Sequence, residues 1–114
     1  MSVTIEQVAA VDVARVTGSI DGKTAPGVGT ALQPLLDGTR NIVIDLSDVD
    51  YVSSAGLRLL LVAYRKVQAT SRRIVLAGVS VNIMQVMSHT GFLPFFVLVP
   101  DAAAALIALA EAPS

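Results

Sequence analysis

Two short apolar runs, one on each side of a long helical pattern, place the tightest limit on the fold. Residues 41–45 and 74–77 are rich in isoleucine and valine, while 55–69 carries leucines at helical spacing. Continuous runs of this kind are typical of strands buried on both faces, which occur in parallel sheets. Two parallel strands need a long crossover, and a helix is the usual one. The sequence therefore predicts an α/β protein built on a mostly parallel sheet.

The rest of the chain continues this alternation of strands and helices. Alternating residues over 3–8 and a valine-rich run over 11–17 predict two strands that pair antiparallel. Thr24 is expected to cap a helix that begins at Ala25, which Pro34 and then Gly38 bend or end. We predict a single α/β domain over residues 1–114, with a mixed, mostly parallel sheet of four to five strands and about four helices. The further elements are strands at 41–45, 74–77 and 95–99 and helices at 55–69, 81–90 and 102–111.

Helical spacing also predicts which side chains face the core. In the helix over 55–69, the core positions are Leu57, Leu60, Leu61, Tyr64 and Gln68. Arg58 lies on another face of this helix. His89 falls in the last turn of the helix over 81–90, where the helix dipole favours a partial positive charge, and Asp101 opens the alanine-rich last helix.

Composition excludes several classes of protein. Hydrophobic residues make up 54% of the chain and charged residues 15%, with a formal net charge of -1. That is too apolar for a disordered chain and lacks the basic excess that neutralises phosphates, so no nucleic-acid partner is expected. No apolar run approaches the roughly 20 residues of a spanning helix, and no signal peptide is visible. We therefore expect a soluble, cytoplasmic protein that does not insert into membranes.

The residues that bind metals are scarce. The chain has no cysteine and one histidine, so neither a metal site nor a cofactor is expected. Asp45, Asp48 and Asp50 are close enough in sequence to hold a divalent cation. A polar loop with turn-forming aspartates is the favoured interpretation of these three residues.

Two loops resemble parts of enzyme active sites but each lacks a required part. Residues 22–24 read Gly-Lys-Thr, as at the end of a phosphate-binding loop, yet only three residues separate Gly18 from Gly22 where the motif has four. Ser54 stands at a strand-to-helix turn, as hydrolase nucleophiles do, but position 52 is not glycine and no acidic residue lies between Ser54 and His89. We expect no enzyme, and a small nucleotide-binding or hydrolytic enzyme is the less favoured alternative.

The serine pair at the start of the 55–69 helix is the most informative stretch. A serine at this place caps a helix, which is worth about 1 kcal/mol. Capping does not explain Gly56, which costs a helix interior about 1 kcal/mol relative to alanine. A missing side chain beside the serine hydroxyl would let another protein come close, and the helix N-terminus would stabilise an anion on that serine. These features outline a phosphorylation switch.

The sequence over 41–57, NIVIDLSDVDYVSSAGL, resembles the signature of STAS domains, specifically of the bacterial anti-sigma factor antagonists. Residues 18–21 followed by Thr24 and Ala25 are similar to the family's segment after the second strand. Residues 74–78 and 91–92 fit its later strand and helix end. The resemblance covers essentially the whole chain and implies a STAS-like domain.

The resemblance implies a partner-switching regulator that is not an enzyme. In such proteins the unphosphorylated antagonist binds an anti-sigma factor that is a serine kinase of the histidine-kinase-like ATPase fold, and the sigma factor is freed. The kinase phosphorylates the antagonist at the serine before the second helix, binding is lost, and a PP2C-type phosphatase restores it. The resemblance places the phosphorylated serine at Ser54.

Partner contacts are expected around this serine. Many family members have Asp before the phosphorylated serine and Ser or Thr after it, whereas this chain has Ser53 and Ala55, so Ser53 is an alternative acceptor. The alternative function is a STAS interaction module without phosphorylation, in a membrane-transport or lipid-trafficking complex. The expected partner-binding residues are Asp21, Thr24, Asp50, Ser53, Gly56 and Arg58.

Low charge makes a phosphate a large perturbation of this surface. A phosphate adds roughly -1.5 to -2 charges, and Asp48 and Asp50 lie close to the serines. Residues 74–100 contain no Asp, Glu, Lys or Arg. Part of this uncharged surface is expected to be a protein-docking face.

Overall fold

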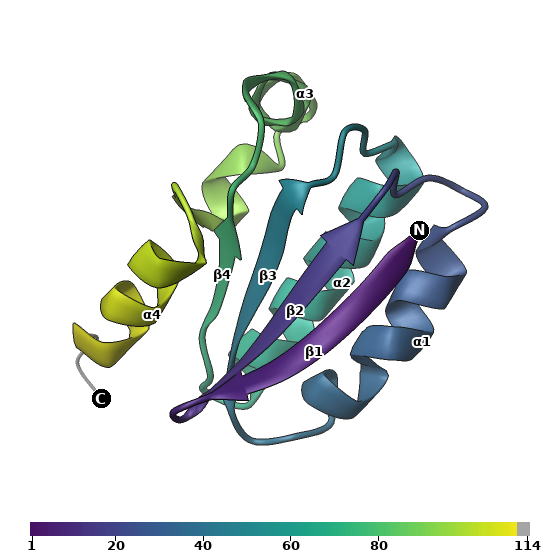
Figure 1. Cartoon of the computed structure of the whole chain (residues 1–114). Helices are drawn as coiled ribbons and strands as arrows, with labels where there is room; N and C mark the ends of the chain where they lie inside the picture. The colour runs from purple at the N-terminus through teal and green to yellow at the C-terminus, as the bar shows by residue number, and fades with distance from the viewer. Residues whose placement is uncertain (112–114) are drawn as a thin grey trace.

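The computed structural model describes residues 1–111, and its elements follow the predicted order. Within these residues a five-stranded mixed sheet and four α-helices confirm the predicted α/β architecture (Figure 1). The strands are β1 (Ser2–Val8), β2 (Val11–Thr17), β3 (Asn41–Asp48), β4 (Ile74–Ala77) and β5 (Val97–Val99). The helices are α1 (Ala25–Leu36), α2 (Ser54–Ala69), α3 (Val81–Thr90), the short 3-10 helix η1 (Leu93–Phe95) and α4 (Ala102–Glu111).

The five strands lie side by side in the order in which they follow one another in the chain. β1 pairs antiparallel with β2 as predicted, and β2, β3, β4 and β5 run parallel. The three parallel crossovers therefore all step in the same direction across the sheet. Because such crossovers are right-handed, α1, α2 and α3 are expected on one face. Their buried side chains do share one core, while α4 packs on the opposite face (Figure 1).

Burial on both faces explains the continuous apolar run in β3. Ile42 and Ile44 face the larger core beneath α1, α2 and α3, whereas Val43 faces the smaller core beneath α4. In β4, Leu76 and Val75 divide in the same way. A strand covered on one face only would alternate polar and apolar residues. Helices therefore cover β3 and β4 on both faces. This packing holds in place the C-terminal end of β3, from which the chain leads into α2.

The buried face of α2 differs in part from the predicted one. Leu61 and Tyr64 are half-buried and Gln68 is exposed, so the predicted face was wrong in its later turns. A helix advances about 100° per residue, so a stripe that starts at position 56 returns after seven and eleven residues. The buried residues are Gly56, Leu57, Leu60, Ala63 and Val67.

Two strand boundaries also differ from the prediction. β3 continues through Ser47 to Asp48, because Thr17 at the end of β2 still pairs with Asp48. The last strand begins at Val97 instead of Phe95. Pro94 has no N–H and a backbone angle suited to the first turn of a helix, and it is the second residue of η1.

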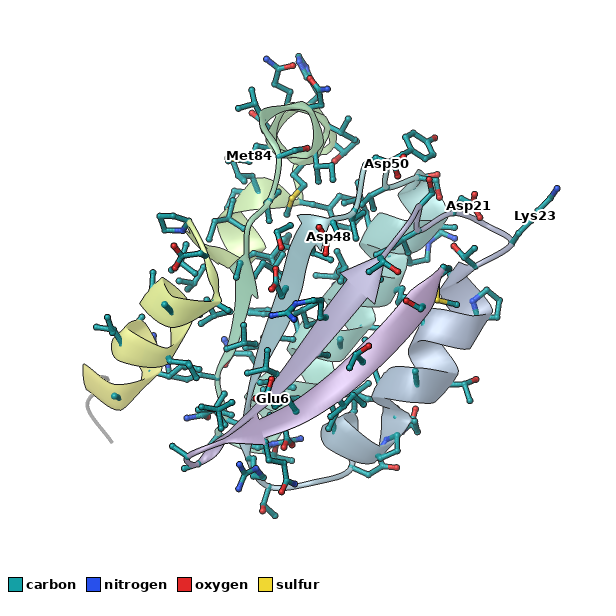
Figure 2. All side chains as sticks on the ribbon, viewed as in Figure 1. Glu6, Asp21, Lys23, Asp48, Asp50 and Met84 are labelled. Atoms are coloured by element: carbon teal, nitrogen blue, oxygen red, sulfur yellow. The ribbon has the colours of Figure 1, made fainter. Side chains whose placement is uncertain are left out.

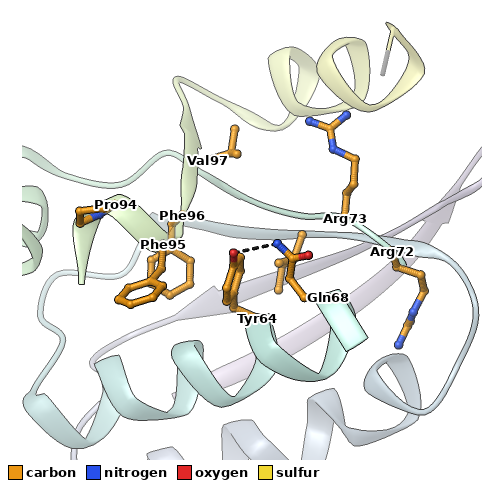
Figure 3. A pocket seen from close by; sticks show the side chains of 9 residues that line it. Tyr64, Gln68, Arg72, Arg73, Pro94, Phe95, Phe96 and Val97 are labelled. Carbon is orange, nitrogen blue, oxygen red and sulfur yellow. Dashed lines mark hydrogen bonds between the residues drawn. The ribbon is translucent and has the colours of Figure 1, made fainter. Parts of the chain in front are cut away.

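Aromatic packing holds η1 against α2. The Tyr64 ring stands edge to face against Phe95 and Phe96, with ring centroids 6.1 and 5.7 Å apart (Figure 3). The Gln68 amide donates to the Tyr64 hydroxyl at 2.7 Å and orients that ring. Arg72, which borders the same pocket, donates to the carbonyls of Leu35 and Leu36 and so closes the end of α1.

Several helix ends follow the predictions. α3 ends at Gly91, which has a positive φ of 81°, and His89 lies exposed in its last turn. The Asp101 carboxylate accepts from the Ala104 amide at 2.8 Å and caps α4. Pro34 lies within α1, which continues to Leu36. Across residues 1–111, every helix is too short or too polar to cross a membrane.

Candidate functional site

The predicted site residues gather at the edge of the sheet where β2 and β3 both end. The loop after β2 and the loop after β3 are joined by three backbone hydrogen bonds. The Gly18 amide donates to the Asp48 carbonyl at 3.1 Å, and the Ile20 amide donates to the Tyr51 carbonyl at 2.9 Å. The Ser53 amide donates to the Ile20 carbonyl at 2.9 Å. This pairing brings residues 18–24 beside the start of α2, although they are about thirty positions away in sequence.

Ser53 is the residue that caps α2. Its backbone is extended, and its hydroxyl accepts from the Gly56 amide at 3.3 Å. The Ser53 carbonyl also accepts from the Leu57 amide at 2.9 Å, the first hydrogen bond of the helix. The side chain is half-buried. Ser53 therefore has a structural function that its hydroxyl must stay in place to perform.

Ser54 is different in exposure and in bonding. It is the first residue of α2, its side chain is exposed, and its hydroxyl makes no hydrogen bond within residues 1–111. The amides of Ser54 and Ala55 likewise donate no hydrogen bond within this part of the chain. Unpaired amides at a helix N-terminus carry partial positive charge and favour an anion. Of the two serines, Ser54 is the more exposed, and its hydroxyl is the one not engaged in the helix cap.

Gly56 is buried against its own chain. A Cβ atom at position 56 would lie 2.6 Å from the Ile20 carbonyl oxygen and 2.8 Å from Cγ1 of Val52. We expected this glycine to make room for a partner, but the atoms that leave no space for a side chain at position 56 belong to the same chain. The loop after β2 crosses so close to α2 that no side chain fits between them.

Asp21 and Thr24 organise the loop after β2. The Asp21 carboxylate accepts from the amides of Lys23 and Thr24 at 2.9 and 3.0 Å. These two backbone hydrogen bonds, from Thr24 first and then from Lys23, hold the pKa of Asp21 below its usual value. The Thr24 hydroxyl donates to the Ser19 carbonyl at 2.7 Å and accepts from the Asp21 amide at 2.9 Å.

The predicted capping of α1 by the Thr24 side chain was wrong. Thr24 occupies the N-cap position, but its hydroxyl accepts nothing from the first turn of α1. Its backbone is helical instead of extended, so the hydroxyl turns back toward the Ser19 carbonyl. The Asp21 carbonyl accepts the Ala25 amide at 2.8 Å instead.

The remaining predicted contacts lie on the outer surface. Asp50 is exposed and accepts from the Ser19 hydroxyl at 3.0 Å. Figure 2 shows Asp21, Lys23 and Asp50 on the same corner of the molecule. Arg58 is exposed one turn after Ser54 and borders a shallow apolar groove between α1 and α2. The groove also includes Ala55, in the first turn of α2.

The three aspartates before α2 do not converge on one point. The Asp45 carboxylate is buried and accepts from Arg15 Nε at 3.1 Å and from the Ser47 hydroxyl at 2.6 Å. Burial raises the pKa of Asp45, but the hydrogen bonds from Ser47 and Arg15 outweigh it and leave the pKa lowered. Within residues 1–111, no three His, Cys, Asp or Glu side chains are grouped as metal ligands. The favoured interpretation of a polar loop was wrong for two of the three residues, because β3 continues to Asp48 and includes the buried Asp45, and only Asp50 lies in the loop.

Sequence reasoning missed two contributors to this site. Ile20 is fully buried, and its carbonyl meets both the Ser53 amide and the space beside Gly56. Tyr51 is 54% exposed directly before the serines. An isolated aromatic residue in a polar loop was the available signal for Tyr51, since exposed tyrosines are enriched where proteins bind one another.

Comparison with known proteins agrees with this geometry. The STAS domain family profile matches residues 2–105. An anti-sigma-B factor antagonist of Staphylococcus aureus is 32% identical over 78 residues, which cover 68% of this chain and 72% of that protein. The crystal structure of an anti-sigma factor antagonist from Mycobacterium paratuberculosis superposes with a TM-score of 0.83 at 29% identity, over 96% of this chain and 94% of that one.

The Bacillus protein SpoIIAA shares the fold at lower identity. Its unphosphorylated form superposes with a TM-score of 0.79 at 18% identity, over 99% of this chain and 100% of that one. Its phosphorylated form superposes with a TM-score of 0.70 at 19% identity, over 93% and 98%. The chain belongs to the STAS domain family. Within that family it groups with the bacterial anti-sigma factor antagonists.

Proposed function

We propose that this protein is an anti-sigma factor antagonist whose binding to an anti-sigma factor is switched by phosphorylation of Ser54. The observation that carries the proposal is the contrast between the two serines. Ser54 presents a free, exposed hydroxyl at the N-terminus of α2, whereas the Ser53 hydroxyl is engaged as the helix cap. The names of the relatives support the antagonist role, and SpoIIAA of the same fold has been solved with and without phosphate.

The proposed partner is a serine kinase of the histidine-kinase-like ATPase fold. In the transfer, the Ser54 oxygen takes the γ-phosphoryl group of ATP, the hydroxyl proton is released and ADP leaves. The first-turn amides and the helix dipole would stabilise the product, because both favour negative charge at this place. A PP2C-type phosphatase would hydrolyse the phosphoserine and restore the hydroxyl.

Loss of docking follows from charge at an exposed protein surface. The phosphate adds roughly -1.5 to -2 charges beside Asp50 and Asp48, both of which are exposed. A partner surface that fits a neutral hydroxyl next to Tyr51 would then meet an unpaired charge, which is costly to desolvate. The fold itself need not change, since the Ser54 side chain contributes nothing to the core.

The phosphorylation test first identifies the kinase by its co-purification with this protein. The kinase is then produced separately and used in the assay. Incubation with ATP followed by peptide mass spectrometry should place one phosphate on Ser54. Ser54→Ala should abolish the modification, and the matched control Ser53→Ala should retain it. A phosphate on Ser53, or on neither serine, would overturn the proposal.

Binding is tested separately with the same kinase. Ser54→Asp should weaken binding at least tenfold by calorimetry, while circular dichroism stays unchanged and the melting temperature does not fall, since the helix N-terminus favours the new negative charge. Equal binding of wild type and Ser54→Asp would favour the alternative of an interaction module without phosphorylation. Tyr51→Ala should weaken binding as well, because truncation of an exposed tyrosine anchor removes contact area.

A further inference from the structure

The groove between α1 and α2 continues well beyond the first turn of α2. Its first part is a hollow of about 370 Å³ that includes Ala55 and Arg58. A second hollow of about 360 Å³ reaches Lys66, near the other end of the helix. The two hollows overlap and form one surface feature, which we call the α1–α2 groove. The residues that line both hollows are Pro26, Gly29, Leu59 and Val62.

The α1–α2 groove has the length and direction of a helix. The residues that α2 contributes at helical spacing are Ala55, Leu59, Val62 and Lys66. Positions separated by three and four residues share one side of a helix, so the groove follows the helix axis. From the first to the last of them, the rise of an α-helix gives a length of about 16 Å. A partner helix of about three turns, laid lengthwise, fits this length.

The floor of the groove is apolar and is not filled by this chain. Val62 is 45% exposed, and Leu59 is half-buried. Position 29 has no side chain, and a Cβ there would lie 3.2 Å from Cδ1 of Leu59. The two helices therefore approach closely beneath the groove. Apolar side chains of a partner would lose water by packing against this floor.

The charges of the groove are all positive. Its lining includes Arg58 and Lys66 and no acidic residue. Both basic side chains are exposed, and within residues 1–111 neither forms an ion pair. α1 contains no charged residue, and α2 contains no acidic one. The groove is thus a basic surface on a chain whose net charge is -1.

Shape and charge together select the occupant. A second copy of this chain would place Arg58 and Lys66 against basic residues, and like charges repel. Anionic lipid suits the charge, but helices that lie on membranes push apolar side chains into the bilayer, whereas the apolar surface here is recessed. A protein helix with acidic side chains beside its apolar face suits both.

We propose that the α1–α2 groove binds an amphipathic helix of the partner kinase, with acidic side chains that pair with Arg58 and Lys66. The inference rests on the proposed function, because the groove begins at Ala55, the residue after Ser54. A kinase that covers Ser54 and extends along α2 enters the groove. Lys66 then anchors the kinase about 18 Å along the helix axis from Ser54.

The first test compares two neighbouring basic residues of α2. Lys66→Glu should weaken binding of the kinase by roughly tenfold or more in calorimetry, because it brings like charges together at the end of the groove. Arg65→Glu is the matched control, since Arg65 is exposed on the same helix but does not line the groove. It should weaken binding by less than about threefold. Equal effects would reflect net charge alone and would overturn the proposal.

Salt gives a second measure of the same ion pairs. Raising the ionic strength should weaken binding of the wild type, because salt screens pairs at a protein surface. The decline should be shallower for Lys66→Glu, in which one attractive pair is replaced by repulsion. The same salt dependence for both proteins would contradict pairing at Lys66.

The apolar floor is tested without changing a basic residue. Val62→Glu places an acidic side chain in the groove and should weaken binding by roughly tenfold. The matched control is Ile107→Glu on α4, because Ile107 is also an exposed apolar residue, at 59%. That control should bind like the wild type, and circular dichroism checks that both variants are folded. Unchanged binding of Val62→Glu would overturn the proposal.

Ser54 is intact in all these variants, so failure of this inference differs from failure of the proposed function. With saturating kinase, Lys66→Glu should still gain a phosphate on Ser54. A phosphorylated wild type with undiminished binding of Lys66→Glu overturns the groove only. A wild type that binds but gains no phosphate overturns the switch, while weaker binding of Lys66→Glu still supports the groove.

Membrane binding is tested with vesicles of phosphatidylcholine and phosphatidylglycerol. The wild type should remain in the supernatant when the vesicles are sedimented. Sedimentation of the wild type that is lost in Lys66→Glu would assign the groove to anionic lipid and overturn the proposal.

Discussion

At the scale of single residues, Gly56 shows how a backbone contact dictates an amino acid. Alanine usually stabilises a helix interior by about 1 kcal/mol over glycine. Here a Cβ would press within 2.6 Å of the Ile20 carbonyl oxygen, a backbone atom that cannot rotate away. The tight crossing of the loop and α2 therefore outweighs helix propensity.

We expect Gly56→Ala to lower the free energy of unfolding by about 1–3 kcal/mol, since overpacked sites must shift backbone. Gly29→Ala is the matched control in α1, where a Cβ meets only Cδ1 of Leu59 at 3.2 Å, the end of a flexible side chain. That variant should be within about 0.5 kcal/mol of wild type or more stable. Urea unfolding of both variants measures the difference. Equal effects would show that the Ile20 carbonyl does not restrict position 56.

Asp45 makes stability depend on acid. Its folded pKa lies below its unfolded value, so its contribution is complete above about pH 4, the unfolded pKa. That contribution is lost as the pH falls through the lower folded pKa, where the carboxylate bonded to Ser47 and Arg15 takes up a proton. Because the folded pKa of Asp45 is the lower of the two, protonation of this carboxylate in acid lowers the free energy of unfolding.

We expect the free energy of unfolding to fall as the pH drops below about 4. Asp45→Asn should be less stable at pH 7, because the charged Arg15 contact is lost, and should show a shallower decline in acid. Urea unfolding at several pH values gives both slopes. Parallel slopes for wild type and variant would assign the acid sensitivity to other carboxylates, such as Asp21.

At the scale of elements, the two neighbouring serines at the start of α2 differ in the contacts that their side chains make. Ser53 joins the helix to the preceding loop through its amide, its carbonyl and its hydroxyl. The Ser54 side chain makes none of these contacts, so a change at its hydroxyl leaves the Ser53 cap in place.

This difference between the two serines predicts different losses in the free energy of unfolding for the two alanine variants. Ser53→Ala should lower the free energy of unfolding by about 0.5–1 kcal/mol, since the cap is lost and its 3.3 Å hydrogen bond is long. Ser54→Ala should stay within about 0.5 kcal/mol of wild type. Thermal or urea unfolding compares the two. A larger loss for Ser54→Ala would mean that the roles of the two hydroxyls are reversed.

At the scale of the whole molecule, the sheet separates two surfaces of different chemistry. The edge where β2 and β3 end carries the serines, Asp50 and Tyr51, all of them beside the first turn of α2. The opposite face carries the apolar outer side of α4. The two surfaces share no side chain, so changes at one should not be felt at the other.

We therefore expect Ile107→Glu, on the outer face of α4, to leave the phosphorylation of Ser54 by the kinase unchanged. The phosphorylation rates of wild type and variant make this comparison. A rate that drops in Ile107→Glu would show that the kinase also contacts the outer face of α4.

The sequence by itself determined the order of elements, the mostly parallel sheet and the serine pair at the start of α2. These follow from local periodicity and turn chemistry, which act over a few residues and can be read in a single chain. Tertiary structure alone decided that Gly56 meets the Ile20 carbonyl, that Thr24 turns toward Ser19, and that Ser53 and not Ser54 is the cap. It also decided that α4, apolar all round, covers the sheet with one side only. Those facts depend on contacts between segments tens of residues apart, and no local pattern in the sequence records such distances.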